Sequence, residues 1–214
     1  MMEMKYRLWA CLLFLPMVLW ASGRPKVAVV LSGGGAKGTA HIGALKVIEE
    51  AGIPIDYVVG TSMGAIVGGL YSIGYTPQQL DSMVNAQNWK FLLSDAPNPK
   101  DVLLDDRLKS ERYVLSIPFS LKSAAVSDAG IIKGKNLARL FSTLTEGYQD
   151  SVDFSRLPIP FACVSENLVN GSEVVFHEGI LATAMRSSMS SHGVFAPLDL
   201  DGMVMVDGGM VNNY

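Results

Sequence analysis

The sequence has only two cysteines and three histidines, too few for a disulfide-stabilised protein or for a zinc site built from Cys and His. Cys11 lies in a segment that we expect to be removed, so no internal disulfide can form. Cys163 lies in a predicted strand, where a small buried hydrophobic side chain is the main interpretation and a nucleophilic thiol is the alternative. We therefore expect neither a metal nor another cofactor.

Positive charge is also scarce. Lys and Arg together number 17 against 20 Asp and Glu, which gives a formal net charge of -3. A nucleic-acid-binding surface needs a basic patch that neutralises phosphates, so we expect no nucleic-acid partner. The sequence has no repeats or low-complexity segments, and 49% of its residues are hydrophobic, so residues 24–214 are predicted to form one well-buried domain.

Residues 1–23 have a different composition. Lys5 and Arg7 precede an apolar block at 8–20, and small residues follow at 21–23. The block is shorter than the roughly 20 residues of a membrane-spanning helix, so a secretory signal peptide is our interpretation and an uncleaved anchor is the alternative. We predict export across the inner membrane, to the periplasm, the outer membrane or the medium. The N-terminal sequence of the mature protein tests this, and full-length protein in the cytosol would contradict it.

Hydrophobic periodicity predicts an alternation of strands and helices. The apolar run at 26–31 is interpreted as a buried strand, and the strand-helix-strand-helix unit over 26–73 implies a parallel pair with a right-handed crossover. Asn170-Gly171 suits a tight turn between two strands. We therefore expect the α/β class. The other expected strands are at 55–59, 113–117, 159–165, 173–177 and 203–206, and the expected helices are at 39–51, 63–73, 77–88, 134–145 and 179–189.

Ser62 is a candidate nucleophile because it is the serine of a G-x-S-x-G sequence between a predicted strand and a predicted helix. A serine on such a turn lies in strained backbone space with crowded neighbours. Gly60 and Gly64 remove the Cβ atoms that would clash. Such a sequence taken alone is weak support, since it also suits an ordinary glycine-rich turn, but the strand before it and the helix after it strengthen the interpretation.

Two further features follow predicted strands in the same way. The glycine-rich loop 33–38 follows the strand at 26–31, and Asp207 follows the strand at 203–206. Because the carboxyl ends of strands line the crevice of an open α/β sheet, both could meet Ser62 there. Acyl transfer needs a serine that attacks, a base that takes its proton, and backbone amides that hold the developing oxyanion. The glycines at 33, 34 and 35 can supply such amides.

The sequences GGGAKG, GTSMG and DGG, in this order, resemble the three signatures of patatin-like phospholipases, and the resemblance spans residues 26–209. It implies a three-layer α/β/α sandwich with a mostly parallel central sheet and a nucleophile elbow. It also implies a Ser-Asp dyad without histidine, in which Ser62 is the nucleophile and Asp207 the base. The implied oxyanion hole lies in the loop that contains Gly33, Gly34, Gly35 and Gly38.

The same resemblance implies the hydrolysis of ester-linked acyl chains from phospholipids or other lipids, with a membrane surface as the place of the substrate. Two departures from the family are visible. Many relatives carry Pro-Gly where this chain has His192-Gly193, so the resemblance does not define the conformation of this turn. Relatives also continue well past the aspartate motif, so this chain could be a fragment or a short form.

A dinucleotide-binding protein is the competing interpretation, because Gly33, Gly35 and Gly38 also satisfy G-x-G-x-x-G, and Asp56 lies 18 residues after Gly38. However, a ribose-binding carboxylate belongs at the carboxyl end of the second strand, whereas Asp56 lies near its start. An inactive secreted module is the third possibility, and it would leave Ser62 and Asp207 without a role. Lys37 is either a cation that attracts a lipid headgroup or a solvated loop residue.

Three histidines could turn the dyad into a Ser-His-Asp triad. In the usual α/β-hydrolase order the histidine follows the acid, and none follows Asp207. His41 shares a helical face with apolar residues, so we expect it to be packed and hydrogen-bonded. His177 and His192 are expected to be exposed, because one ends a hairpin strand and the other lies in a serine-rich turn.

Overall fold

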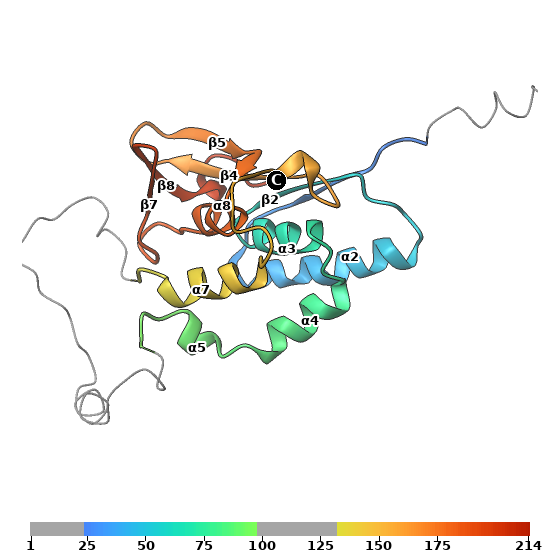
Figure 1. Cartoon of the computed structure of the whole chain (residues 1–214), viewed down its shortest axis with the longest axis horizontal. Coiled ribbons are helices and arrows are strands. Elements are labelled where there is room, and N and C mark those ends of the chain that lie inside the picture. Colours follow the sequence, from blue (N-terminus) through green and yellow to red (C-terminus); the bar gives the residue numbers. More distant parts are fainter. Residues whose placement is uncertain (1–23, 98–131) are drawn as a thin grey trace, which may run out of the picture.

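A computed structural model of the chain describes residues 24–97 and 132–214. The expected signal peptide at 1–23 and the expected strand at 113–117 lie outside the described residues. None of the helices in the described part is long and apolar enough to cross a membrane. The described residues form an α/β sandwich, which confirms the class expected from the sequence (Figure 1).

The strands in the described ranges are β1 (Ala28–Leu31), β2 (Tyr57–Thr61), β3 (Val152–Asp153), β4 (Phe161–Asn167), β5 (Ser172–Phe176), β6 (Glu178–Gly179), β7 (Leu198–Leu200) and β8 (Met203–Asp207). Six of them form one mixed sheet in the order β1-β2-β4-β8-β7, with β5 also paired to β4. β1, β2 and β4 are parallel, as expected for the first strand-helix-strand unit, whereas β5, β8 and β7 join by antiparallel pairing. β3 and β6 form a separate antiparallel pair.

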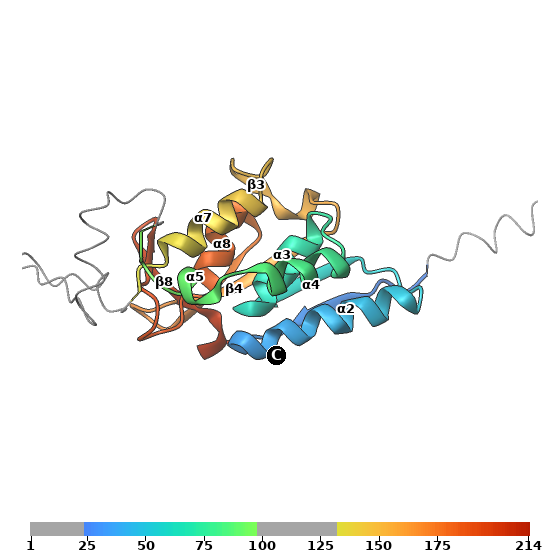
Figure 2. The same ribbon diagram turned by 90° about the horizontal axis from the view of Figure 1, so that it is seen from below.

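The α-helices in the same part of the chain are α2 (Ala40–Glu50), α3 (Met63–Ser72), α4 (Pro77–Ala86), α5 (Trp89–Leu92), α7 (Lys135–Leu144) and α8 (Leu181–Ser188), and the 3-10 helices are η1 (Gly35–Thr39), η3 (Phe154–Arg156) and η4 (Gly208–Met210). In Figure 1, α2, α3, α4 and α7 lie together below the strands, and Figure 2 shows them from that side. α4 begins at Pro77, as expected, and Thr76 before it forms a capping box with Gln79.

Small residues let α3 lie close to the sheet. α3 packs on β1, β2 and β4, and α8 packs on β4 and β8. A Cβ atom at Gly68 would lie 2.7 Å from the Val58 side chain, and one at Gly69 would lie 2.7 Å from Met185 Sδ. Larger side chains at these two positions would therefore push α3 away from β2 and α8.

The length of β4 brings the ends of two other strands together. The first residues of β4 pair with β2, up to Thr61 opposite Val164, and the next residue, Ser165, pairs with Asp207 of β8. β5 pairs with residues 163–167 along the opposite edge of β4. β2 and β8 therefore run toward each other along one edge of β4, and they meet where β2 ends.

Several expected elements differ from those in the structure. The strand at 26–31 was expected to be buried, but β1 is at the edge of the sheet, and Val30 is 56% exposed. The helix expected at 77–88 ends at Ala86, because the backbone at Gln87 is extended and Asn88 caps the short helix α5. The helix expected at 179–189 begins at Leu181, because the two residues of β6 pair with β3. β3, β6, β7 and α5 were not expected from the sequence.

Candidate active site

Ser62 forms a sharp turn between β2 and α3. Its φ is +54°, in a region of backbone conformation that residues other than glycine rarely adopt, so the backbone at this turn is strained. The neighbouring elements hold it in place: the Ser62 N–H donates to Ser188 Oγ at 2.9 Å, and Ser188 Oγ donates to the Val164 carbonyl at 2.5 Å. α8 and β4 thus support the strained residue through Ser188.

The two glycines that flank this turn have no room for a side chain. A Cβ atom at Gly60 would lie 2.4 Å from the Gly64 carbonyl oxygen, which is the crowding expected within the turn. A Cβ atom at Gly64 would lie 2.0 Å from the carbonyl oxygen of Leu31 in β1. A glycine is therefore needed at position 64 for a second reason, which the sequence did not indicate: α3 starts directly against β1.

Ser62 and Asp207 are in direct contact. Ser62 Oγ donates to Asp207 Oδ2 at 2.8 Å, and the two residues are only 7% and 9% exposed. The other carboxylate oxygen, Oδ1, accepts the Gly209 N–H at 2.8 Å, and the Asp207 N–H donates to the Ser190 carbonyl at 3.1 Å. The carboxylate is thus fixed by η4 and by the turn after α8, with one oxygen directed at the serine.

A second serine shares that carboxylate oxygen. Ser191, in the turn after α8, donates from its Oγ to Asp207 Oδ2 at 2.7 Å and is half-buried. The buried Arg186 stabilises this turn, because its guanidinium donates to Ser190 Oγ and to the Lys133 carbonyl. Burial lowers the pKa of Arg186 to about 10, so the side chain stays charged at neutral pH.

The four glycines of the candidate oxyanion loop have different surroundings. The Gly33 N–H already donates to Asn213 Oδ1 at 2.6 Å. Gly38 is buried in η1, where a Cβ atom would lie 2.6 Å from Met63 Cβ, so it serves close packing. Gly34 and Gly35 are exposed and line a cavity that contains Ser62. Of the four, these two line the cavity with neither the N–H partner of Gly33 nor the close packing of Gly38.

Two cavities meet at Ser62, and they differ in polarity. The first, of about 330 Å³, contains polar groups from the glycine loop, Asp207, His192 and Asn213. The second, of about 530 Å³, is lined mainly by apolar side chains from α3, α5 and the turn after α8, such as Ile66, Trp89 and Phe195. Ser62 therefore lies on the boundary between a polar space and an apolar one.

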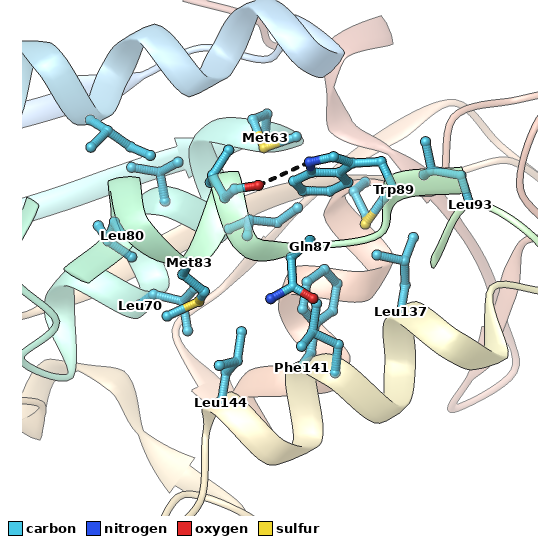
Figure 3. A pocket seen from close by; sticks show the side chains of 16 residues that line it. Met63, Leu70, Leu80, Met83, Gln87, Trp89, Leu93, Leu137, Phe141 and Leu144 are labelled. Carbon is cyan, nitrogen blue, oxygen red and sulfur yellow. Dashed lines mark hydrogen bonds between the residues drawn. The ribbon is translucent and has the colours of Figure 1, made fainter. Parts of the chain in front are cut away.

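A smaller apolar space adjoins the apolar cavity, between α3, α4 and α7. This inner pocket, of about 70 Å³, is drawn in Figure 3, where Met83, Leu137, Phe141 and Leu144 point into it. Trp89, whose Nε1 donates to the Val84 carbonyl at 3.0 Å, lies at its edge (Figure 3). Residues that line both spaces are Met63, Ile66, Val84, Trp89, Leu93 and Met189.

No histidine in the described ranges hydrogen-bonds to Ser62 or Asp207. His41 Nε2 lies 2.8 Å from the Ser32 carbonyl oxygen and the ring is half-buried, so the expected packed, hydrogen-bonded state is confirmed. His177 and His192 are exposed, as expected. Of the three, only His192 lines the polar cavity beside Ser62 and Asp207, and it forms no hydrogen bond with either residue.

The remaining candidates from the sequence lie elsewhere. Cys163 is fully buried in β4, and this burial raises the pKa of its thiol, which fits a hydrophobic role. Asp56 lies at the opposite end of β2 from Ser62, where the Arg24 guanidinium and the Val27 N–H hold its pKa below the usual range. Lys37 is exposed. The described residues include no group of three or more His, Cys, Asp or Glu side chains suited to a metal ion.

Three residues of the site were not expected from the sequence: Ser188, Ser191 and Asn213. The first two belong to a serine-rich run at 187–191, which covers the end of α8 and the turn after it, and Asn213 follows the DGG sequence closely. Serine and asparagine are common in turns, so neither pattern indicates a contact by itself. Their contacts with Ser62, Asp207 and Gly33 depend on how α8 and η4 pack in the folded chain.

Comparison with protein families and relatives adds to this geometry. A family model described as "Patatin-like phospholipase" matches residues 29–214. An uncharacterized NTE family protein of Mycobacterium tuberculosis is 31% identical over 191 residues, which are 89% of this chain and 44% of that protein. Patatin-like phospholipase domain-containing protein 6 of Homo sapiens is 30% identical over 189 residues, 87% of this chain and 12% of that protein. The chain thus spans less than half the length of these relatives.

Solved structures with a similar fold come from bacterial proteins. VipD from Legionella pneumophila matches with a TM-score of 0.56 and 17% identity, over 88% of this chain and 47% of that chain. A chain in the complex of full-length SpcU with full-length ExoU from Pseudomonas aeruginosa matches with a TM-score of 0.51 and 22% identity, over 78% of this chain and 38% of that chain. At these identities the likeness concerns the fold.

Proposed function

Because the chain belongs to the patatin-like phospholipase family, we propose that it is a serine acyl hydrolase that cleaves ester-linked acyl chains from phospholipids or other lipids. The observation that carries the proposal is the 2.8 Å hydrogen bond from Ser62 Oγ to Asp207 Oδ2, at the point where an apolar cavity meets a polar one. A screen of ester hydrolysis across acyl lengths, with Ser62→Ala protein as the control, tests it. An inactive module would hydrolyse none of these esters.

In the first half of the proposed reaction, Ser62 Oγ attacks the carbonyl carbon of the ester while its proton passes to Asp207 Oδ2. The carbonyl oxygen becomes an oxyanion, to which we assign the N–H groups of Gly34 and Gly35 as donors, because both residues line the cavity at Ser62. The tetrahedral intermediate then collapses, the bond to the alcohol oxygen breaks, and that oxygen takes the proton from Asp207. The products are the free alcohol and an acyl group on Ser62.

The apolar cavity is the proposed site of the acyl chain. Its volume of about 530 Å³ and its apolar lining fit a hydrocarbon chain whose carbonyl lies at Ser62. The inner pocket extends this space toward α7, which favours a long chain over a short one. The polar cavity would receive the alcohol part of the substrate. We propose a lipid surface as the partner, because Trp89, Leu93 and Val194 are exposed and line the apolar cavity.

Ile66→Trp is predicted to shift the preference of the enzyme from long to short acyl chains. Ile66 lines both the apolar cavity and the inner pocket, so the larger side chain should reduce the space available to a long chain in both. Each methylene group denied burial costs about 0.8 kcal/mol, so kcat/KM should fall about tenfold for every two methylenes excluded. The measurement compares kcat/KM for palmitate and butyrate esters of p-nitrophenol, where only the palmitate value should fall.

Val47→Trp is the matched control, because Val47 is an exposed residue of α2 that lines neither space. This variant should keep the acyl-chain preference of the wild type. An equal loss on both esters in Ile66→Trp, or no change on palmitate, would show that the acyl chain lies elsewhere.

A further inference from the structure

Two serine hydroxyls converge on one oxygen of Asp207. Ser62 Oγ donates to Oδ2 at 2.8 Å and Ser191 Oγ donates to the same atom at 2.7 Å, while the other oxygen accepts only from the Gly209 N–H among the described residues. A dyad in which Asp207 takes the proton of Ser62 needs only the Ser62 hydroxyl on Oδ2. The second hydroxyl therefore calls for a role of its own.

We propose that Ser191 is a positioning residue that holds Asp207 during the second half of the reaction, when water removes the acyl group from Ser62. The proposal rests on the proposed function, since it requires an acyl group on Ser62. It gives a task to a hydroxyl that the first half of the reaction does not use.

The number of donors on Asp207 changes during the reaction. In the free enzyme, Oδ2 accepts from two hydroxyls. Once Ser62 is acylated, its Oγ is bonded to the acyl carbon and carries no proton to donate. Ser191 then supplies the hydroxyl that still holds Oδ2, and the lone pair that Ser62 has left can accept from the attacking water. Without Ser191, the described residues would supply no donor to Oδ2 in the acylated enzyme.

Ser191 is held in a place suited to this task. Its N–H donates to the Met189 carbonyl at 2.7 Å, and its own carbonyl accepts the N–H groups of Val194 and Phe195 at 3.1 and 3.0 Å. The backbone of the turn is thus fixed without any contribution from the substrate. Ser191 also lines both cavities at Ser62, so water in the polar cavity can reach Asp207 beside it.

The step itself balances with the groups present. A water molecule gives one proton to Asp207 Oδ2 while its oxygen forms a bond to the acyl carbon, and the carbonyl oxygen becomes an oxyanion. The bond between the acyl carbon and Ser62 Oγ then breaks, and Ser62 Oγ takes the proton from Asp207. The fatty acid is released, and the hydrogen bond from Ser62 to Asp207 forms again.

The experiment measures the two halves separately with p-nitrophenyl dimethylcarbamate, which transfers a slowly hydrolysed carbamoyl group to an active-site serine. Release of p-nitrophenolate gives the rate of carbamoylation, and intact mass of the purified adduct gives the rate of its hydrolysis. In Ser191→Ala on the full chain, hydrolysis of the adduct should slow by about 10- to 100-fold, the effect of losing a hydrogen bond to a charged group. The fold reduction in the rate of carbamoylation should be at least five times smaller than the fold reduction in adduct hydrolysis.

Three further variants make this result specific. Ser191→Thr keeps a hydroxyl and should restore adduct hydrolysis, whereas Ser191→Cys, a weaker donor of nearly the same size, should give an intermediate rate. Ser187→Ala is the matched control, because Ser187 is a buried serine nearby whose Oγ has no hydrogen-bond partner in the described part of the chain. It should behave like the wild type.

Equal slowing of both halves in Ser191→Ala, or no slowing of adduct hydrolysis, would overturn the proposal, because Ser191 would then serve no task specific to the acylated enzyme. If Ser191→Ala does not fold, as judged by thermal unfolding, the Thr and Cys variants carry the same comparison. Failure of the proposed function has a different signature, since the wild-type protein would then acquire no carbamoyl group on Ser62.

Discussion

Ser62→Ala is expected to lose ester hydrolysis by at least about 10⁴-fold, because the substitution removes the atom that forms the bond to the acyl carbon. The steady-state rate on a p-nitrophenyl ester of a long-chain fatty acid measures the loss. Alanine is smaller than serine and Ser62 Oγ has one hydrogen-bond partner, Asp207, so the fold should persist. Removing the hydroxyl leaves the carboxylate with Ser191 and Gly209 as donors.

The control for this variant is its thermal unfolding curve, which should resemble that of the wild type. Ser188→Ala provides a contrast, because Ser188 Oγ hydrogen-bonds to the Ser62 N–H and the Val164 carbonyl and not to Asp207. We expect Ser188→Ala to lower stability and to retain more activity than Ser62→Ala. Activity near that of the wild type in folded Ser62→Ala would exclude Ser62 as the nucleophile.

Asp207→Asn is expected to reduce activity by about 10²- to 10⁴-fold, the usual contribution of a general base. The amide keeps the shape of the carboxylate, but it cannot take the proton of Ser62. The direct hydrogen bond from Ser62 Oγ to Asp207 Oδ2 places the carboxylate where it can take that proton. Steady-state kcat on the same ester, with thermal unfolding as a check on the fold, measures the effect.

The three histidines are the comparison for Asp207→Asn. None hydrogen-bonds to the dyad in the described ranges, so His41→Gln, His177→Ala and His192→Ala should each keep activity within about tenfold of the wild type. His192→Ala is the most informative of these, because His192 lines the polar cavity beside Asp207. One folded histidine variant that loses as much activity as Asp207→Asn would make that histidine the base.

Local features of this site could be predicted from the sequence because they depend on neighbours in the chain. The turn at Ser62 needs glycine two residues away on each side, and a strand before it and a helix after it, all of which are visible as residue patterns. The helical spacing of His41 with apolar residues likewise indicated that it is packed. The capping of α4 by Thr76 and Pro77 is another short-range feature that a sequence shows directly.

The contact between Ser62 and Asp207 was expected for a reason that is only partly correct. The sequence suggested that both follow strands whose carboxyl ends line the crevice of an open α/β sheet. In the structure β8 is antiparallel to β4, and Asp207 reaches Ser62 because β4 extends past the end of β2. The length of β4 and the register of β8 are set by pairing between distant segments, which a residue pattern does not reveal.

The residues missed at the site show the same limit. Ser191 and Asn213 are polar residues in turns, and their contacts with Asp207 and Gly33 join segments far apart in the chain. The burial of β1 was overestimated because a valine-rich run resembles a central strand, whereas its place at the edge of the sheet depends on the order of all the strands. Such features follow from tertiary packing.

The central claim is that Ser62 is the nucleophile, and covalent labelling with a fluorophosphonate followed by peptide mass spectrometry tests it most directly. The account predicts one adduct on the wild-type protein, located at Ser62 within the peptide that contains residues 60–65, and none on Ser62→Ala. Labelling should be slower in Asp207→Asn, because the base that activates the hydroxyl is missing. An adduct on another residue, or no adduct on the folded wild-type protein, would contradict the claim.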